Sequence, residues 1–325
     1  MAEPGHIAAI LVDWGTTNLR LWAINPQGRV IGAARGSEGM NTLSNSEFSS
    51  VFERYAAELG AHETTPAMIC GMAGARDGWR EANYVATPFR PDDLVSNTVH
   101  FQSGAREIAI MPGASFQHGN RFDVMRSEET QLAALISRGV TDGVICMPGT
   151  HSKWVDVRNG QIVSFSTSMT GELFSVLKSH SILRSLTTDA AFDETDPDFN
   201  TGLKTGLDTP DDLMTNLFAL RARAMIERHA KMNMQAQLSG LLIGTDVASA
   251  VDRFPQTDTV HLVSSGHSTQ LYRRALEAIG SSVQIHDGEE LSRTGLFQAA
   301  HSIWPHHLCE PDNPKARQGA LTADG

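Results

Sequence analysis

The chain has 325 residues, of which 41% are hydrophobic and 19% charged, as in an ordinary globular protein. This length predicts one large or two medium domains. The formal net charge of −11 argues against a general nucleic-acid or anionic-membrane surface, because such surfaces need a positive field. It leaves room for a local basic pocket that binds a phosphorylated small molecule.

The three cysteines predict a reducing compartment. Cys70, Cys146 and Cys309 are odd in number and far apart and form no CxxC motif, so neither a disulfide framework nor a structural zinc site is expected. Cys70 and Cys146 lie in apolar, strand-like runs and should be buried. The first residues lack the basic and apolar regions of a signal peptide, and no apolar run is long enough to cross a membrane. We therefore expect a cytoplasmic protein.

The first 140 residues read as strands and helices in alternation. Three short strands open the chain, and residues 25–28 form a turn between the second and the third. A helix with apolar residues at helical spacing follows, and then a buried strand and a polar loop. The expected ranges are 7–12, 19–24 and 29–34 for the opening strands, 46–59 for the helix, 67–72 and 108–111 for later strands, and 126–136 for a second helix.

The opening pattern restarts near residue 143. An apolar run at 144–147 leads into Pro148-Gly149-Thr150-His151-Ser152, and a turn at 158–160 leads into an expected strand at 161–166. Gly15-Thr16 in the first copy corresponds to Gly149-Thr150 in the second. Gly28 likewise corresponds to Gly160, although the second hairpin is two residues shorter. The match in order, residue type and turn position indicates a weak internal repeat.

The remaining sequence continues the alternation. Helices are expected at 171–177, 212–231, 238–251, 268–279 and 289–300, and strands at 259–264 and 282–286. Strand–helix alternation in each half predicts α/β layers.

The two Gly-Thr turns are suited to phosphate. Glycine lets the main chain approach a ligand closely, and the N–H groups and hydroxyls of such a turn point into one space. Asp13, just before the first turn, has the carboxylate that a hydrated Mg²⁺ favours, whereas Met147 occupies the matching place in the second. The pattern predicts one metal-organising turn and one phosphate-cradling turn. The simpler alternative for Asp13 is a turn cap.

Six blocks of the sequence resemble the 2-dehydro-3-deoxygalactonokinase family of the sugar kinase, Hsp70 and actin ATPase superfamily. They are VDWGTTNLRLW, CGMAGARDGW, MRSEETQL, MPGTHSKWV, SMTGELFSVLKSHSIL and LVSSGHSTQLYRRAL, which run from residue 10 to about residue 276. MPGTHSKW and MTGELF are specific together, whereas DWGTTN alone would indicate only the superfamily. The resemblance implies an α/β fold of two ribonuclease-H-like (actin-like ATPase) domains, residues 1–139 and 140–325, with an interdomain ATP cleft. It also allows the last helix to pack on the first domain.

The same resemblance implies the activity and most of its residues. The reaction would be phosphorylation of the 6-hydroxyl of 2-dehydro-3-deoxy-D-galactonate, in the De Ley–Doudoroff branch of galactose catabolism, with ATP and Mg²⁺ as cofactors. Asp13 would order Mg²⁺ through water, with Gly15, Thr16, Thr17 and Asn18 near the γ-phosphate. The β-phosphate would be cradled by Gly149, Thr150, His151 and Ser152, with charge from Lys153. The adenosine side would be formed by Ser265, Gly266 and Ser268, assisted by Gly244 near the start of an interdomain helix.

A carboxylate is also expected to take the proton from the sugar hydroxyl. Glu128 and Glu129 lie at a helix start, and EETQL resembles the EEARL of exopolyphosphatases. Both remain candidates for the base, and the simpler alternative is that they complement the helix N-terminus. Ser127 stands where the block would have glycine, so the local backbone geometry is open.

Recognition of the substrate carboxylate is expected from an arginine, which offers a bidentate partner. The candidate is Arg76, in a loop with Gly74 and Trp79, and its alternative is a surface arginine. Thr170, Gly171 and Glu172 open a helix whose N-terminus is expected to face the same anion; Thr170 as a mere N-cap is the alternative.

Other functions are weighed against this interpretation. An actin-like or chaperone-type ATPase would share the fold but leave GMAGARDGW and SMTGELF unexplained. A transcription factor would need a helix-turn-helix ahead of the first strand, and an exopolyphosphatase would need a long basic channel. A kinase for the epimeric 2-dehydro-3-deoxygluconate stays open, as does a homodimer. P-loop, HExxH and GxSxG motifs are absent from the sequence.

Overall fold

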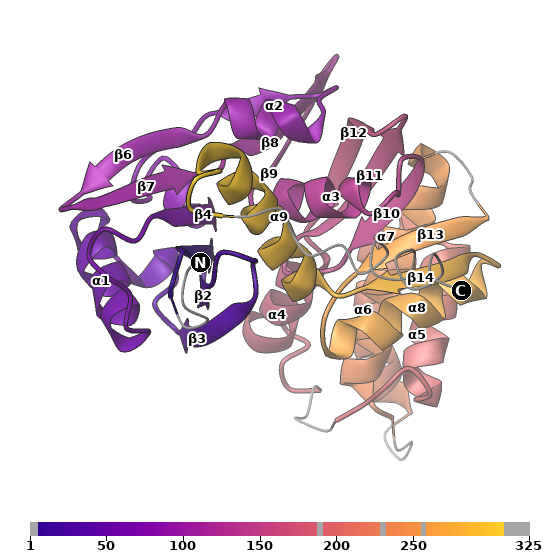
Figure 1. Cartoon of the computed structure of the whole chain (residues 1–325). Helices are drawn as coiled ribbons and strands as arrows, with labels where there is room; N and C mark the ends of the chain where they lie inside the picture. The colour runs from indigo at the N-terminus through magenta and orange to yellow at the C-terminus, as the bar shows by residue number, and fades with distance from the viewer. Residues whose placement is uncertain (1–5, 187–190, 228–231, 255–257, 309–325) are drawn as a thin grey trace, which may run out of the picture. The chain divides into compact units, whose positions relative to one another are not determined.

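The computed structural model describes residues 6–186, 191–227, 232–254 and 258–308 (Figure 1). The chain divides into two compact units. Unit 1 contains the described residues up to Gln117, Val124–Gly139 and those from Glu290 onward. Unit 2 contains His118–Asp123 and Val140–Glu289.

Unit 1 is built on a six-stranded sheet with the order β3-β2-β1-β4-β7-β6. Strand β1 is antiparallel to β2 and parallel to β4. All residues of β1 and β4 are buried, so both strands appear in the sequence as unbroken apolar runs. The strands are β1 (Ala9–Trp14), β2 (Leu19–Ile24), β3 (Val30–Gly36), β4 (Ala67–Gly71), β6 (Val99–Ser103) and β7 (Arg106–Ile110).

Among the described residues of unit 1, three longer helices accompany this sheet. They are α1 (Phe48–Glu58), α3 (Glu128–Ser137) and α9 (Gly288–Ile303), the last of which belongs to unit 1 from Glu290 onward. Helix α1 packs Phe48 and Phe52 into the core against Trp14 and Trp79. A methyl group added to Gly28 would lie 2.7 Å from the Phe297 ring, so α9 lies directly on the β2–β3 turn.

The segment between Tyr84 and Met125 is more structured than the sequence predicts. Only one strand is expected there, whereas the structure has β6 and β7, the short helix α2 (Pro91–Ser96) and a three-stranded sheet with the order β5-β8-β9. Its strands are β5 (Tyr84–Ala86), β8 (Gly113–His118) and β9 (Arg121–Met125). β5 and β9 are short and largely exposed, so they carry no apolar period that a sequence pattern could reveal.

Unit 2 repeats the architecture of unit 1. Its five-stranded sheet has the order β12-β11-β10-β13-β14, which matches β3-β2-β1-β4-β7. Strand β10 is antiparallel to β11 and parallel to β13, as β1 is to β2 and β4. The strands are β10 (Gly143–Met147), β11 (Ser152–Arg158), β12 (Gln161–Ser168), β13 (Thr259–Val263) and β14 (Ser282–His286). The predicted fold class, two ribonuclease-H-like domains, is confirmed.

The described part of unit 2 contains five helices. They are α4 (Thr170–His180), α5 (Pro197–Asp208), α6 (Leu213–Ile226), α7 (Met234–Arg253) and α8 (His267–Ala278). Helix α5 was not predicted, and α7 begins four residues before the expected start at 238. The end of the helix expected at 212–231 lies partly outside the described residues.

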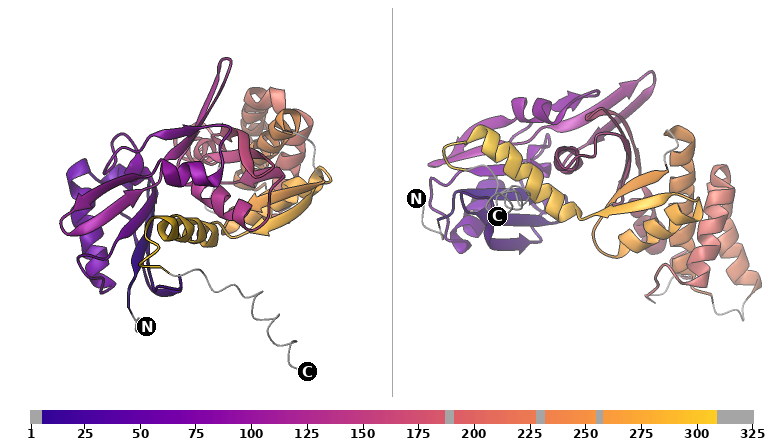
Figure 2. Two further views of the ribbon diagram at one scale, coloured as in Figure 1. Left: turned by 45° about the horizontal axis from the view of Figure 1, so that its top comes forward. Right: turned by 45° about the vertical axis from the view of Figure 1, so that its right-hand side comes forward.

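Helices α5 and α7 run side by side in very close contact (Figures 1 and 2). Four glycines at the contact make this spacing possible: Gly202 and Gly206 on α5, and Gly240 and Gly244 on α7. A methyl group on any of them would clash with the backbone of the facing helix. Glycine lowers intrinsic helix propensity by about 1 kcal/mol relative to alanine, so the same residues that allow this packing hide α5 from a sequence pattern.

Two further predictions concern cysteines and the membrane. Cys70 and Cys146 are fully buried free thiols, as predicted, and Cys309 lies outside the described residues. None of the helices in the described ranges combines the length and the apolar character needed to span a bilayer.

Candidate active site

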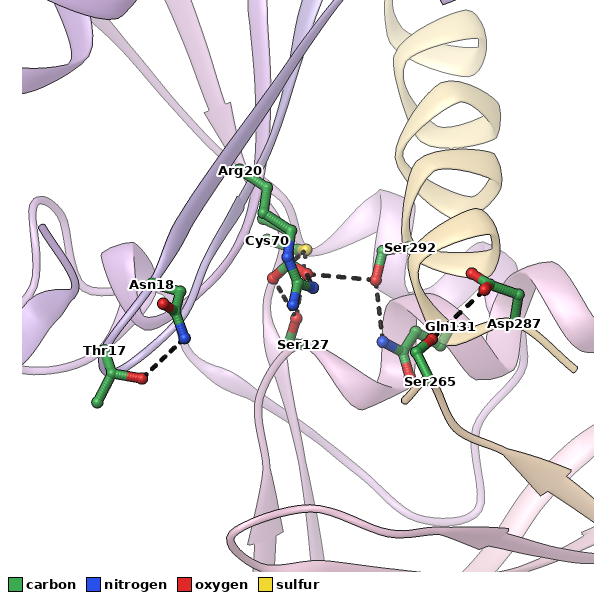
Figure 3. Close-up of polar contacts among 10 residues, drawn as sticks. Thr17, Asn18, Arg20, Cys70, Ser127, Gln131, Ser265, Asp287 and Ser292 are labelled. Carbon is green, nitrogen blue, oxygen red and sulfur yellow. Dashed lines mark hydrogen bonds and ion pairs between the residues drawn. The ribbon is translucent and has the colours of Figure 1, made fainter. Parts of the chain in front are cut away.

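The first Gly-Thr turn joins β1 to β2 in unit 1. The Gly15 N–H donates to the Asn18 carbonyl at 2.8 Å and closes the turn. A segment further along the chain braces it, because the N–H groups of Met40 and Asn41 donate to the carbonyls of Gly15 and Thr16. Thr16, Thr17 and Asn18 are exposed, and the Asn18 amide donates to the Thr17 hydroxyl at 3.0 Å (Figure 3). The turn is therefore a fixed backbone loop with accessible hydroxyls.

Asp13, the last-but-one residue of β1, accepts several hydrogen bonds. Ser127 donates to its Oδ1 at 2.9 Å, and Ser292 of α9 donates to its Oδ2 at 3.4 Å (Figure 3). Arg20, directly opposite on β2, forms an ion pair with Oδ2 at 3.4 Å. Gln131 of α3 donates to Ser292 at 2.9 Å, so the network extends into two helices. Asp13 thus connects β1, β2, α3 and α9.

Burial raises the pKa of Asp13, and the hydrogen bond from Ser127 and the charge of Arg20 act against this rise. The Asp13 side chain keeps about a tenth of its surface exposed. No group of three His, Cys, Asp or Glu side chains that could hold a metal occurs among the described residues. One carboxylate with an exposed edge does fit a Mg²⁺ that arrives on nucleotide phosphates and keeps its waters.

The start of α3 lies beside Asp13. Ser127 is the N-cap of α3 and has φ = 99°, a left-handed conformation that glycine adopts at little cost. The backbone geometry that the sequence left open is therefore the one that glycine would favour. The main-chain N–H groups of Arg126 and Ser127 donate to the carboxylates of Glu128 at 3.1 Å and Glu129 at 3.0 Å. Both predicted base candidates therefore fold back on the turn before the helix.

The two glutamates differ in their surroundings. Glu129 is fully buried and one of its oxygens, Oε2, has no hydrogen-bond partner. Burial, followed by the nearby charge of Glu128, raises the pKa of Glu129 to about 8. Glu128 is only partly buried. The raised pKa favours the protonated form of Glu129 at neutral pH.

The predicted substrate loop is partly a packing element. Trp79 belongs to the aromatic core, with its ring centroid 5.6 Å from Phe52 and 5.4 Å from Phe101, so a packing role accounts for it. Arg76 is exposed. A methyl group on Gly74 would lie 2.7 Å from Nη1 of Arg126, an arginine that was not among the predicted site residues.

Arg126 has unused hydrogen-bonding capacity. Its Nη2 donates to the Ala82 carbonyl at 2.8 Å, and its guanidinium lies 4.5 Å from the centroid of the Tyr84 ring. Nε and Nη1 are buried without hydrogen-bond partners. Burying N–H groups without hydrogen-bond acceptors is unfavourable in free energy, so an acceptor bound to the guanidinium would be stabilising.

The second Gly-Thr turn, in unit 2, is packed against the start of α4. The Glu172 N–H donates to the Thr150 carbonyl at 2.9 Å, and a side chain on Gly171 would clash with the main chain of Gly149. The carboxylate of Glu172 also forms a hydrogen bond with Nε2 of the His151 ring. The structure therefore places Thr170, Gly171 and Glu172 against this phosphate-type turn.

The base of this turn is fixed by a buried carboxylate. Asp246 of α7 accepts hydrogen bonds from the Ser152 hydroxyl at 2.6 Å, the Trp154 indole at 3.1 Å and the Tyr272 hydroxyl at 2.7 Å. The Ser152 side chain is thus engaged in the interior, and the whole residue is buried. Lys153 is buried, with Nζ donating to the His151 carbonyl at 3.2 Å. No sequence pattern indicated Asp246, an acid in the largely apolar and buried part of α7.

The predicted adenosine turn borders a cavity of about 480 Å³ in unit 2. Gly266, the N-cap of α8, has φ = 83°, and open space surrounds the position of its missing side chain. Ser268 lines the cavity together with Gly149, Thr170 and Gly171. Ser265 is exposed and donates to Asp287 at 3.5 Å (Figure 3). Gly244 is not among the lining residues and packs against α5, so its predicted role on the adenosine side stays a prediction.

Comparison with known proteins bears on the whole of this arrangement. A sequence model of the 2-keto-3-deoxy-galactonokinase family matches residues 13–299. The chain belongs to this family. It is 40% identical over 308 residues to the "Probable 2-dehydro-3-deoxygalactonokinase DgoK1" of Rhizobium meliloti (strain 1021), an alignment that covers 94% of this chain and 100% of the relative. It is 33% identical to the 2-dehydro-3-deoxygalactonokinase of Escherichia coli (strain K12), over 90% of this chain and 98% of the relative.

A solved structure supports the same membership. The crystal structure of a "putative 2-dehydro-3-deoxygalactonokinase protein" from Sinorhizobium meliloti superposes with a TM-score of 0.87 and 38% identity, covering 91% of this chain and 99% of that one. The resemblance seen in the six sequence blocks is therefore confirmed. Galactonokinases of this family are carbohydrate kinases, so the chain is an enzyme of that class.

Several residues of this galactonokinase contribute to the candidate site although no motif predicted them. Ser292, Arg126, Asp246 and Gln235 each join or line the candidate site, either from outside the six blocks or from positions within them that were not predicted. Of these only Arg126 carried a usable signal, because it lies two residues before the predicted base candidates.

Proposed function

We propose that the protein transfers the γ-phosphoryl group of ATP to the 6-hydroxyl of 2-dehydro-3-deoxy-D-galactonate. The observation that carries this proposal is the family match over residues 13–299, together with relatives of that name aligned over almost their full length. An actin-like or chaperone-type ATPase is not favoured, because the matched family consists of sugar-acid kinases.

Unit 2 would bind the nucleotide. The Gly149–His151 turn offers exposed main-chain groups for the phosphates, and the cavity beside it has the mixed glycine and apolar lining that a nucleoside needs. Thr170 and Gly171 line that cavity, so we assign them to the nucleotide and not to the sugar acid. Asp246 would hold the turn in place through Ser152.

Unit 1 would supply the groups that act on the transferred phosphoryl group. Asp13, Thr16 and Thr17 would hold the hydrated Mg²⁺ and the γ-phosphate. Bound Mg²⁺ supplies charge neutralisation on the phosphate oxygens. Arg20 and Ser127 keep the Asp13 carboxylate oriented and favour its ionised form. Phosphoryl transfer asks mainly for positioning and charge stabilisation, which these fixed side chains provide.

Glu128 is the base that the geometry favours. The 6-hydroxyl oxygen would form a bond to the γ-phosphorus while the bond from that phosphorus to the β–γ bridging oxygen breaks. The hydroxyl proton would pass to the Glu128 carboxylate, and ADP would leave with the electron pair of the broken bond. Glu129, whose pKa is about 8, would remain protonated beside it.

The substrate carboxylate would be bound by an arginine of unit 1. Arg126 is the stronger candidate, since two of its guanidinium nitrogens are buried without partners and Gly74 makes room for it. Arg76, the arginine predicted from the sequence, stays as the alternative.

Mg²⁺-dependent ADP release tests the proposal. The purified protein would be given ATP alone, ATP with 2-dehydro-3-deoxygalactonate, and ATP with the gluconate epimer. Strong stimulation by the galactonate is expected, with phosphorus at carbon 6 of the product. Stimulation by the gluconate alone would transfer the assignment to the epimer, and bound ATP without stimulation by either would overturn the kinase assignment.

A further inference from the structure

The cavity in unit 2 has one strongly apolar side. Phe174 of α4, Leu242 and Ile243 of α7, and Leu271 of α8 line it, together with Phe192. The Phe192 ring meets the His267 ring edge to face, with centroids 5.3 Å apart. Flat apolar surfaces of this kind suit an aromatic ring system.

Polar side chains also line the cavity, among them two from α7. Gln235 and Ser239 are four residues apart on α7, so they lie on the same face of the helix, and both line the cavity. Gln235 is only 9% exposed and Ser239 only 7%. They are therefore part of the cavity wall and not of the solvent-facing surface.

The Gln235 side chain has an unsatisfied acceptor. Its Oε1 is buried and has no hydrogen-bond partner. Burying an amide oxygen without a donor is unfavourable, and Gln235 also lines the cavity, so rotation of its amide toward a donor on a bound molecule would be favoured. The start of the helix is firmly placed, because Asn233 caps α7 by accepting from the Ala236 N–H at 3.2 Å, and its own N–H donates to Asp198 of α5 at 2.6 Å.

We propose that Gln235, with Ser239 beside it, reads the exocyclic amino group of adenine and makes the nucleotide site selective for ATP. The proposal rests on the proposed function, which puts the phosphates of ATP at the Gly149 turn and the base in the same cavity. The adenine ring fits the apolar walls, and its amino group supplies the N–H that Gln235 Oε1 lacks. A 6-oxo purine presents a carbonyl oxygen at this place and would face that acceptor with another acceptor.

The experiment compares three triphosphates in direct binding to the full chain, without sugar acid. They are ATP, purine riboside triphosphate, which lacks the amino group, and inosine triphosphate, which has an oxygen in its place. We expect ATP to bind about tenfold more tightly than either analogue, the value of roughly one well-placed hydrogen bond. Gln235→Met, which keeps the length and removes the amide, should reduce this ratio to about one by weakening ATP.

The chain offers a matched control on the same helix. Gln237 is also buried and its Oε1 also lacks a partner, but it lines a separate cavity of about 100 Å³ beside Gly202 and Leu220. Gln237→Met should leave the preference for ATP at the wild-type ratio. Equal loss in both variants would indicate a general effect on α7 and would overturn the inference.

The outcomes separate this inference from the proposed function. If the wild-type protein phosphorylates the sugar acid but binds purine riboside triphosphate or inosine triphosphate as tightly as ATP, the base-reading role fails and the kinase stands. If Gln235→Met retains the tenfold preference, the role also fails. Absence of any nucleotide binding would overturn both.

Discussion

The hydroxyl of Ser127 donates to Oδ1 of Asp13 at 2.9 Å, joining residues 114 positions apart in the sequence. Ser127 makes this contact from a left-handed backbone conformation, φ = 99°, which costs a non-glycine residue of the order of 1–3 kcal/mol. The strain at Ser127, the N-cap of α3, is therefore accompanied by a hydrogen bond to the carboxylate that we assign to Mg²⁺.

Two substitutions separate the strain from the hydrogen bond. Ser127→Gly should raise the melting temperature by removing the strain, whereas Ser127→Ala keeps the strain. Both remove the donor that lowers the Asp13 pKa, so that pKa should rise further. The acidic limb of the pH–rate profile should shift to higher pH in both variants, with more Mg²⁺ needed for half-maximal rate. A purely structural role would leave the profile and the Mg²⁺ requirement as in the wild type.

The two glutamates at the start of α3 should respond differently to substitution. Glu128→Gln removes the proposed base and should lower kcat by about 10²–10⁴-fold with little change in the KM for ATP. Glu129→Gln should retain kcat within a few-fold, since the wild-type side chain is already protonated at neutral pH. Steady-state kinetics at pH 7 decide this, and the reverse pattern would make Glu129 the base.

Glu129 should also make stability depend on pH. Its pKa is raised from 4.5 to about 8, so the folded protein keeps a proton that the unfolded chain releases. The stability of the wild type should therefore fall as pH rises from about 4.5 to about 8 and then level off. Glu129→Gln has no such proton to lose, so its melting temperature should exceed the wild-type value by an increasing margin between pH 5 and pH 8.5. A constant margin would contradict the raised pKa.

Arg126 and Arg76 form a natural pair of variants for the substrate carboxylate. Arg126→Lys keeps the charge but loses the planar fork, and it should raise the KM for the sugar acid about tenfold or more. Arg76→Ala, at an exposed position, should change that KM by less than about twofold. The KM for ATP serves as the control in both. A large effect of Arg76→Ala with a small effect of Arg126→Lys would assign binding of the substrate carboxylate to Arg76.

Gly244→Ala tests the close contact between α5 and α7. Alanine would gain up to about 1 kcal/mol in helix propensity, but the added methyl group clashes with the Leu203 carbonyl. Overpacking of this kind costs about 1–3 kcal/mol, so net destabilisation is expected. Denaturant unfolding measures it, with Ser249→Ala on the same helix as the control. An unchanged or raised stability would show that the helices can separate freely.

Much of the fold could be predicted because the central strands are buried on both faces. β1, β4 and β10 are therefore nearly continuous apolar runs, and the glycine-containing turns repeat in both halves. The elements that escaped prediction lack that signal. α5 contains two glycines that only the packing against α7 explains, and β5 and β9 are short and exposed.

The candidate site could be predicted only where a motif carries it. Asp13 and the two Gly-Thr turns are local patterns, whereas the packing contacts of Trp79 and Gly244 were not apparent in the sequence. Ser292 and Asp246 are polar residues within helices that carry several others, and nothing local distinguishes them from surface side chains. Their roles depend on which distant residues they meet, which a single sequence does not contain.

The contact between Ser292 and Asp13 has a consequence for biosynthesis. The two residues are 279 positions apart, and Phe297 of the same helix lies against the Gly28 turn. Strand β1 of unit 1 leaves the ribosome before all of unit 2, yet Asp13 lacks its Ser292 donor until α9 emerges. Unit 2, encoded almost without interruption between these points, can close its own sheet earlier. The half of the enzyme that is translated first is therefore the half that is finished last, and a ribosome stalled before α9 would carry an incomplete Asp13 site.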